Sequence, residues 1–223
     1  KSKNKQKKIK NYNISAMIKN TANDSHEMLI SLMNVSLILD KVCILNNISL
    51  EIHANEHYLI LGENGAGKTT LLNLIMKNID PSQGRVTYTK KIIFSSLTQF
   101  NFDVNVKMTC LDVLGTILNY TKEEWISKYS EYFEPNFWDK RISVLSGGEL
   151  KKFLIFLSLL KDFDILVLDE PTTFVDIQTK YSIIKMLNSC NKCIITVTHD
   201  SDIIMNMTGT KLIISNGNIN LLD

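Results

Sequence analysis

The segment that most restricts the fold of this chain is glycine-rich: LGENGAGKTT, from Leu61 to Thr70. It stands between a short apolar run, HYLILG, and a second apolar run whose spacing fits a helix. Glycines at such a junction let backbone N–H groups converge on an anion at the positive end of the helix, where Cβ atoms would occupy the space. The pattern G-x-x-x-x-G-K-T therefore predicts a phosphate-binding loop, or P-loop, between a strand and a helix.

Two side chains of this loop have expected roles of their own. Lys68 would reach the β- and γ-phosphates, and the Thr69 hydroxyl would bind Mg²⁺. A chance glycine-rich turn is the alternative, and the flanking strand and helix patterns disfavour it. The motif does not name the nucleotide, but guanine-binding relatives need N-K-x-D, and NKCI at 191–194 lacks the Asp. The expected nucleotide-binding residues of the loop are Gly62, Glu63, Asn64, Gly65, Ala66, Gly67, Lys68, Thr69 and Thr70.

The rest of the chain alternates strand-like and helix-like segments. Residues 28–60 contain short β-like runs, and ILVLD and CIITVT are continuous apolar runs of the kind found in strands buried on both faces. Helices are expected at 68–79, at 149–161 and, as a pair, within 109–133, where Thr121 and Glu124 can form a capping box. The alternation predicts an α/β fold with a largely parallel sheet.

Two local patterns near the carboxyl end are also informative. Asp176 can cap a helix over 177–188 that has Ile177, Tyr181, Ile184 and Leu187 on one face. The dipeptide NG at 216–217 stands between two apolar runs, which is a strong hairpin signal.

Carboxylates follow the strand-like run ILVLDE. Asp169 would lie at the carboxyl end of that strand, where an open α/β sheet presents its ligand site, and could hold Mg²⁺. Glu170 would be free to orient or deprotonate an attacking water. A structural acid pair at a strand end is the alternative.

A second helix start rich in backbone donors occurs at LSGGE. Ser146, Gly147 and Gly148 precede the apolar helix and form another phosphate-type site, so the chain carries two. Two such sites suggest a shared interface, although a lone motif of this kind can also be a capped helix.

Charge and composition limit the partners. Seven of the 25 basic residues lie in the first 27 positions, so a basic extension precedes a net negative remainder, and no nucleic-acid partner is expected. We expect residues 1–27 to be flexible. The longest apolar runs are too short to span a bilayer. Four cysteines in a chain of 223 residues do not suggest a disulfide framework, and Cys190 and Cys193 are expected to be ordinary thiols between a helix and a strand.

Taken in order, these motifs resemble the ATP-binding cassette (ABC) ATPase family, from about Met28 to Asp223. The P-loop at 62–69, LTQF with Gln99, LSGGE, ILVLDE and TVTHD with His199 carry the resemblance. It implies a P-loop NTPase (RecA-like) core with a mostly parallel sheet, an N-terminal antiparallel β-subdomain and a helical insertion at about 101–144. Residues 28–223 would form this ATPase domain.

The resemblance also implies how the site works. Two copies would pack head to tail with ATP and Mg²⁺ between them. One copy would supply the P-loop, Gln99, Asp169, Glu170 and His199, and its partner Ser146, Gly147 and Gly148. The expected catalytic residues are Glu170, His199, Gln99 and Lys68, and the expected metal ligands are Thr69, Gln99 and Asp169. The other histidines, His26, His53 and His57, are expected at the surface.

The sequence departs from the family pattern at two positions before the P-loop. An aromatic residue that stacks on adenine usually lies about two dozen positions upstream, and here the nearest match is Leu39. The glycine usual in the turn before the P-loop strand is Asn55, which tolerates a positive φ.

The expected function is the ATP-hydrolysing subunit of a transporter. It would act on the inner, cytoplasmic face of a membrane, with its membrane-spanning partners in other polypeptides or in another part of a longer one. A soluble non-transport ABC ATPase, acting on ribosomes, DNA or cofactor assembly, is the alternative. A regulatory module without turnover is a third, which the presence of Lys68, Glu170 and His199 disfavours.

Overall fold

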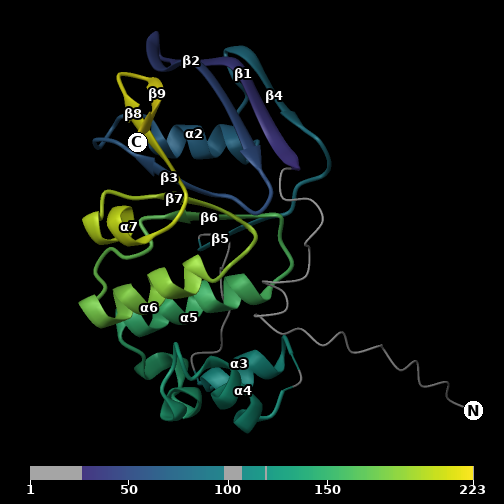
Figure 1. The fold of residues 1–223 in the computed structure, drawn as a ribbon, viewed down its shortest axis with the longest axis vertical. Helices are drawn as coiled ribbons and strands as arrows, with labels where there is room; N and C mark the ends of the chain where they lie inside the picture. The colour runs from purple at the N-terminus through teal and green to yellow at the C-terminus, as the bar shows by residue number, and fades with distance from the viewer. Residues whose placement is uncertain (1–26, 98–106, 119, 223) are drawn as a thin grey trace, which may run out of the picture.

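The computed structural model describes residues 27–97, 107–118 and 120–222, and its strands form two sheets. A three-stranded sheet has the order β2-β1-β4, and a six-stranded sheet has the order β5-β6-β7-β3-β8-β9. Figure 1 shows α2 between these sheets and α5 and α6 on the other face of the larger one. The strands are β1 (Met28–Leu39), β2 (Val42–His53), β3 (His57–Leu61), β4 (Gln83–Tyr88), β5 (Phe94–Ser96), β6 (Ile165–Asp169), β7 (Cys193–Val197), β8 (Thr210–Ser215) and β9 (Asn218–Leu222).

The helices follow the same chain order. They are α2 (Lys68–Ile75), α3 (Cys110–Gly115), α4 (Lys122–Tyr129), the 3₁₀ turns η2 (Pro135–Asp139) and η3 (Ile142–Val144), α5 (Gly147–Leu160), α6 (Ile177–Asn188) and α7 (Ser201–Asn206). Within the described ranges no helix is long and apolar enough to cross a membrane.

The six-stranded sheet is parallel except at one edge. β3 lies between β7 and β8 and is parallel to both, and β6 is parallel to β5 and β7. Only β9 runs antiparallel, joined to β8 by the Asn216–Gly217 turn, in which both residues have positive φ. The predicted hairpin and the mostly parallel α/β sheet are therefore confirmed. One consequence is that β3, β6 and β7 all point their carboxyl ends toward the same edge.

Alternating residues of the central strands enter two different cores. Leu166 and Leu168 pack in a cluster with α5 and α6, while Ile165 and Val167 pack in a second cluster with α2 and the small sheet. Because side chains alternate across a strand, a strand covered on both faces is apolar at every position. This explains the continuous apolar runs in the sequence.

The helices between β5 and α5 are held together by aromatic side chains. Trp125 of α4 packs against Trp138 and against Phe156 of α5. The predicted capping box of α4 is present, with the Thr121 hydroxyl accepting from the Glu124 amide and the Glu124 carboxylate accepting from the Thr121 amide. Figure 1 shows these elements below α5, at the far end of the molecule from the small sheet.

Three expectations from the sequence need correction. The P-loop helix ends at Ile75 and does not reach residue 79. In α6 the predicted apolar face is wrong at its start, because Ile177 and Tyr181 are 54% and 47% exposed and the buried positions include Ile183 and Met186. The physical reason is that the packing partner, α5, covers a stripe shifted around the helix.

The third correction concerns His57, which is 8% exposed and not a surface residue. It is the first residue of β3, and its Nε2 lies 2.9 Å from the carbonyl oxygen of Cys190. Burial lowers the pKa of His57, and hydrogen bonds to backbone carbonyls oppose this. Cys190, which follows α6, and Cys193, the first residue of β7, are free thiols, as predicted. Asn55 has a positive φ of 62°, the conformation that it was expected to tolerate.

Candidate functional site

The glycine-rich loop leaves the carboxyl end of β3 and enters α2. Gly62 has φ 146°, and a Cβ there would lie 2.5 Å from the carbonyl oxygen of Ile214. Gly67 caps α2 with φ 102°, and a Cβ there would lie 3.0 Å from Leu45. No side chain caps α2, so the first N–H groups of this helix remain directed at the loop. The loop is thus a backbone cradle for an anion, with glycine required at both positions.

Lys68 points back across this loop. Its Nζ donates to the carbonyl oxygens of Gly62 and Glu63, at 2.8 and 2.9 Å, and the residue is 8% exposed. A buried ammonium needs such acceptors, because an unpaired charge away from water is strongly unfavourable. Phosphate oxygens entering the cradle would offer the same ammonium stronger, charged acceptors.

Asp169 ends β6 beside the start of α2. Desolvation raises the pKa of this carboxyl, and the negative charge of Glu170 raises it further, while Lys68 and a hydrogen bond with the Thr69 side chain lower it. A carboxylate and a hydroxyl in contact are the hard oxygen ligands that Mg²⁺ prefers. The donor set of Thr69 and Asp169 therefore fits a magnesium ion.

Glu170 stands next to Asp169 in an unusual backbone conformation. Its φ is 49°, and its amide donates to the Val197 carbonyl at 2.9 Å, which ties it to the end of β7. The carboxylate Oε1 lies 2.7 Å from Nδ1 of His199, which follows β7. This contact favours the imidazole tautomer with its proton on Nδ1, so a neutral ring presents Nε2 as an acceptor.

A pocket of 380 Å³ is lined by Lys68, Asp169 and Glu170 but not by His199. A second pocket, of 390 Å³, contains none of these residues. The 380 Å³ pocket, called here the P-loop pocket, brings the loop together with both acids and with two aliphatic residues from the small sheet. Its lining residues are Leu39, Ile44, Asn64, Gly65, Gly67, Lys68, Thr69, Thr70, Asp169 and Glu170. Leu39, the nearest sequence match to the adenine-stacking position, therefore does face this pocket.

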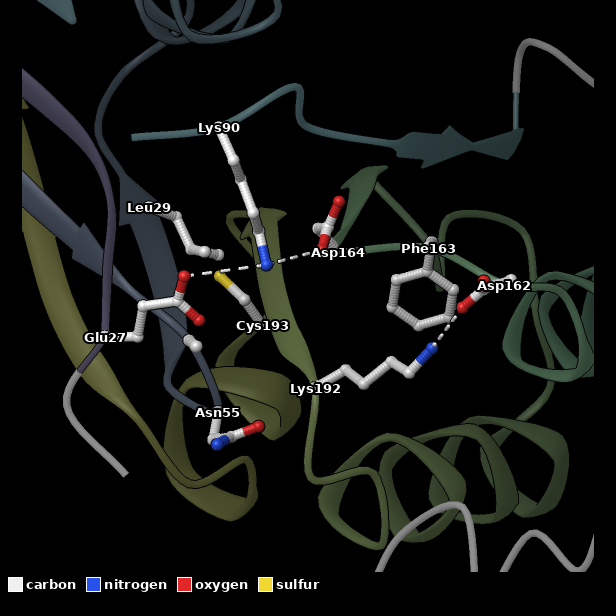
Figure 2. Close-up of a pocket in the computed structure, with 10 residues that line it drawn as sticks. Glu27, Leu29, Asn55, Lys90, Asp162, Phe163, Asp164, Lys192 and Cys193 are labelled. Carbon is white, nitrogen blue, oxygen red and sulfur yellow. Dashed lines mark hydrogen bonds and ion pairs between the residues drawn. The ribbon is translucent and has the colours of Figure 1, made fainter. Parts of the chain in front are cut away.

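Figure 2 shows the 390 Å³ pocket, which lies at the opposite end of the sheet. It is lined by residues at the starts of three parallel strands, among them Asn55, Asp164 and Cys193. Lys90 lies between Glu27 and Asp164, at 3.6 and 3.2 Å, and Lys192 contacts Asp162 at 3.2 Å. The two lysines of this pocket already form ion pairs with its acids, so we do not regard it as a candidate ligand site.

The second predicted phosphate site is separate from the P-loop pocket. Ser146 caps α5 in a capping box with Glu149, and Ser146 and Gly147 are exposed. A Cβ on Gly148 would lie 3.3 Å from a carboxylate oxygen of Asp176, and a Cβ on Gly147 would meet no atom within 4 Å. None of the three residues lines the P-loop pocket. Ser146 and Gly147 lie apart from it at an exposed helix start, whereas Gly148 is buried and the Ser146 amide donates to the Glu149 carboxylate at 2.9 Å. Gln99 lies outside the described residues, as does His26.

Two sets of polar contacts around the site were not anticipated from the sequence. Asp200 accepts from the Thr172 hydroxyl at 2.7 Å and pairs with Lys180 at 2.8 Å. Lys151 of α5 donates to the carbonyl oxygens of Glu170 and Thr173, at 3.1 and 3.0 Å. Both sets hold the turn that follows Asp169. Lys151 and Lys180 lie on helices, and their positions in the sequence form no motif. Their contacts with this turn are therefore evident only from the fold.

The sequence of this chain matches a known protein family. The sequence model of the ABC transporter family matches residues 45–173, more than half of the chain. The chain belongs to the ABC transporter family. Its sequence is 35% identical, over 82% of the chain and 81% of the relative, to the zinc import ATP-binding protein ZnuC of Wigglesworthia glossinidia brevipalpis. It is 34% identical to the ATP-binding protein Uup of a Buchnera aphidicola strain, of which it spans 31%.

Solved structures of ABC proteins have the same fold. A nucleotide-free ATP-binding cassette from an ABC transporter superposes with a TM-score of 0.64 at 21% identity, covering 86% of this chain and 89% of that one. A bacterial Atm1-family ABC exporter with ATP bound gives a TM-score of 0.65 at 21% identity, covering 87% of this chain and 38% of that one. The fold is thus that of an ABC cassette. The family match and the ATP-binding relatives identify the chain as the ATP-binding and ATP-hydrolysing component of an ABC transporter.

Proposed function

We propose that this chain binds Mg²⁺ and ATP in the P-loop pocket and hydrolyses the ATP between two chains packed head to tail. The observation that carries the proposal is the P-loop pocket itself, where Lys68, Asp169 and Glu170 converge on one glycine cradle. The exposed Ser146 and Gly147 would meet the γ-phosphate of the partner's nucleotide. Backbone N–H groups at the start of α5 suit that role.

The roles of the chain's own residues follow from positioning and charge. Lys68 would exchange the Gly62 and Glu63 carbonyls for β- and γ-phosphate oxygens, and Asp169 and Thr69 would hold Mg²⁺, which neutralises developing charge. Glu170 would accept the proton of the attacking water while the bond between the γ-phosphorus and the bridging oxygen breaks. His199 holds the Glu170 carboxylate through Nδ1, so it would donate to phosphate through Nε2 only as an imidazolium. Gln99 is proposed to contact Mg²⁺ or the water.

The transport role rests on the family and on the relatives. Several are named zinc import ATP-binding proteins, which supports an importer in which separate membrane subunits carry the substrate. Zinc is the first cargo to test, and the cytoplasmic face of a membrane is the expected location. The soluble alternative has less support, because more of the relatives are named zinc import ATP-binding proteins than Uup. Isolation with a polytopic membrane protein would support the transporter, and isolation with ribosomes would contradict it.

The chemistry is tested by replacing Glu170 with Gln. Glu170→Gln keeps the size and the hydrogen-bonding capacity of the side chain but cannot take a proton from water, so we expect ATP binding to persist and turnover to fall by about 100-fold or more. The variant should also elute as a dimer when ATP and Mg²⁺ are present. Glu123→Gln, on the exposed face of α4, is the matched control and should hydrolyse ATP like the wild type. Normal turnover in Glu170→Gln would contradict the assignment of Glu170 as the proton acceptor.

A further inference from the structure

The turn that carries Glu170 is strained at both ends. Glu170 has φ 49° and Phe174 has φ 62°, and neither is glycine. An aromatic residue rarely adopts the left-handed region, and such conformations persist only where surrounding contacts hold them. Phe174 is 99% exposed, so its own side chain contributes almost no packing to the turn. Other groups must therefore hold the backbone between residues 170 and 174.

The hydrogen bonds within this turn are long and therefore weak. The Thr173 amide donates to the Glu170 carbonyl at 3.4 Å, and the Val175 amide donates to the Thr172 carbonyl at 3.2 Å. Both distances lie at the long end of the range for N–H···O bonds. On one side the turn is fixed by the Glu170 amide, which donates to the Val197 carbonyl at 2.9 Å, and by the Thr172 hydroxyl, which donates to Asp200 at 2.7 Å.

Lys151 supplies the holding contact on the other side. Its Nζ donates to the carbonyl oxygens of Glu170 and Thr173, at 3.1 and 3.0 Å, which lie at the two ends of the turn. Hydrogen bonds from a charged donor are stronger than neutral ones, and one ammonium binding two carbonyls fixes their separation. Burial lowers the pKa of Lys151, and the charge of Glu170 opposes this.

We propose that Lys151 is a positioning residue for ATP hydrolysis, which holds the backbone of the Glu170–Phe174 turn and so fixes the direction of the Glu170 carboxylate. The inference rests on the proposed function of Glu170. Lys151 lies one turn into α5, the helix that begins with the Ser146–Gly148 segment. A shift of that helix start, when a second chain's nucleotide binds there, would reach the catalytic turn through this side chain.

The adjacent Lys152 provides a matched control. It lies on the same helix and is also half-buried, and its Nζ donates to a backbone carbonyl at 3.0 Å. That carbonyl belongs to Tyr132, and the ammonium lies over the Phe133 ring, 4.8 Å from its centroid. Lys152 therefore shares the burial and charge of Lys151, but within the part of the chain that the structure describes it makes no hydrogen bond to the turn.

The test measures backbone hydrogen exchange in the full chain without nucleotide, in peptides covering residues 169–176. In Lys151→Met, which keeps the flexible apolar stem of the side chain but removes the ammonium, exchange at Thr173 and Val175 should rise about tenfold. Lys151→Arg should restore slow exchange, and Lys152→Met should match the wild type. If Lys151→Met does not fold, Lys151→Gln takes its place, because its amide is one atom shorter and cannot reach both carbonyls.

Turnover is measured on the same variants. For Lys151→Met we expect kcat to be about tenfold lower and the KM for ATP to be unchanged. The phosphate cradle is untouched, but the backbone that directs the Glu170 carboxylate is no longer held by Lys151. Wild-type exchange in Lys151→Met, an equal rise in Lys152→Met, or a mobile turn with unchanged kcat would each overturn the proposal. A wild-type chain without hydrolysis would count against the proposed function instead, and the exchange result would still decide whether Lys151 holds the turn.

Discussion

At the scale of single residues, the P-loop pocket contains groups that are already held near their working positions. Lys68 is anchored by two carbonyls, Glu170 by His199, and Asp169 by a hydrogen bond with Thr69. Such pre-organisation lowers the cost of ordering side chains when a nucleotide arrives. We therefore expect a conservative change at one of these residues to affect catalysis more than stability.

His57 is a residue whose burial sets a pH dependence of stability. Its folded-state pKa lies below the ordinary 6.5, so the unfolded chain binds a proton first as the pH falls. We expect the free energy of unfolding to drop below about pH 6.5, by up to about 1.4 kcal/mol per pH unit, until the folded pKa is reached. Denaturant unfolding at a series of pH values measures this slope.

The controls for that prediction are two glutamine substitutions. His57→Gln keeps a donor toward the Cys190 carbonyl but removes the titrating ring, so its share of the slope should disappear. His53→Gln, at a more exposed histidine, should keep the wild-type slope. A His57→Gln variant with an undiminished slope would contradict the assignment.

Leu39 is the residue that we propose to face the base of the nucleotide. It lines the P-loop pocket and is 49% exposed, so an aromatic ring there has room to stack on a base. Leu39→Tyr should tighten ATP binding about fivefold, from ring stacking worth roughly 1 kcal/mol. Equilibrium binding of ATP measures the gain, and Ile38→Tyr, at a neighbouring position 43% exposed that does not line the pocket, should give none.

At the scale of elements, the junction of β3, the loop and α2 is the most constrained segment of the site. Gly62 has a positive φ and packs against the Ile214 carbonyl of β8, so the loop and the neighbouring strand restrict each other. Gly62→Ala should lower the free energy of unfolding by about 2 kcal/mol or more. Gly147→Ala, where an added Cβ meets open space, should stay within about 0.5 kcal/mol. Thermal and denaturant unfolding compare them, and equal stability of the two variants would refute the steric argument.

The sequence predicted these elements unevenly, for identifiable reasons. The hairpin at Asn216–Gly217 and the capping box of α4 depend on neighbours in sequence, and they appear as expected. The buried face of α6 depends on where α5 lies, so Ile177 and Tyr181 were placed wrongly. His57 was misjudged for the same reason, because its partner is the carbonyl of Cys190, 133 residues away.

At the scale of the whole molecule, the parallel sheet brings most of the expected site residues to one edge, while the residues at the start of α5 lie elsewhere. β3, β6 and β7 deliver the P-loop, the acid pair and His199 to one edge, which is where open α/β sheets present their ligand sites. Ser146, Gly147 and Gly148 belong to α5 and do not line the P-loop pocket. If a second chain supplies them, one chain alone has an incomplete site.

This separation predicts that turnover depends on chain concentration. ATPase activity per chain should rise with concentration and level off, because the active form contains two chains. Ser146→Arg should abolish that rise by crowding the interface, while ATP affinity measured on the dilute chain stays within about twofold. Activity per chain that is constant over a 100-fold dilution would contradict the head-to-tail arrangement.

The sequence by itself determined the phosphate cradle, the two acids, the order of motifs and the type of fold. These follow from local spacing, because glycine geometry, strand and helix periods and capping act between residues close in the chain. Only the tertiary structure decided that Leu39 and Ile44 line the P-loop pocket and that Lys151 reaches the catalytic turn. It also decided that the start of α5 lies apart from that pocket. These contacts join residues distant in sequence, and their geometry is set by how the layers pack.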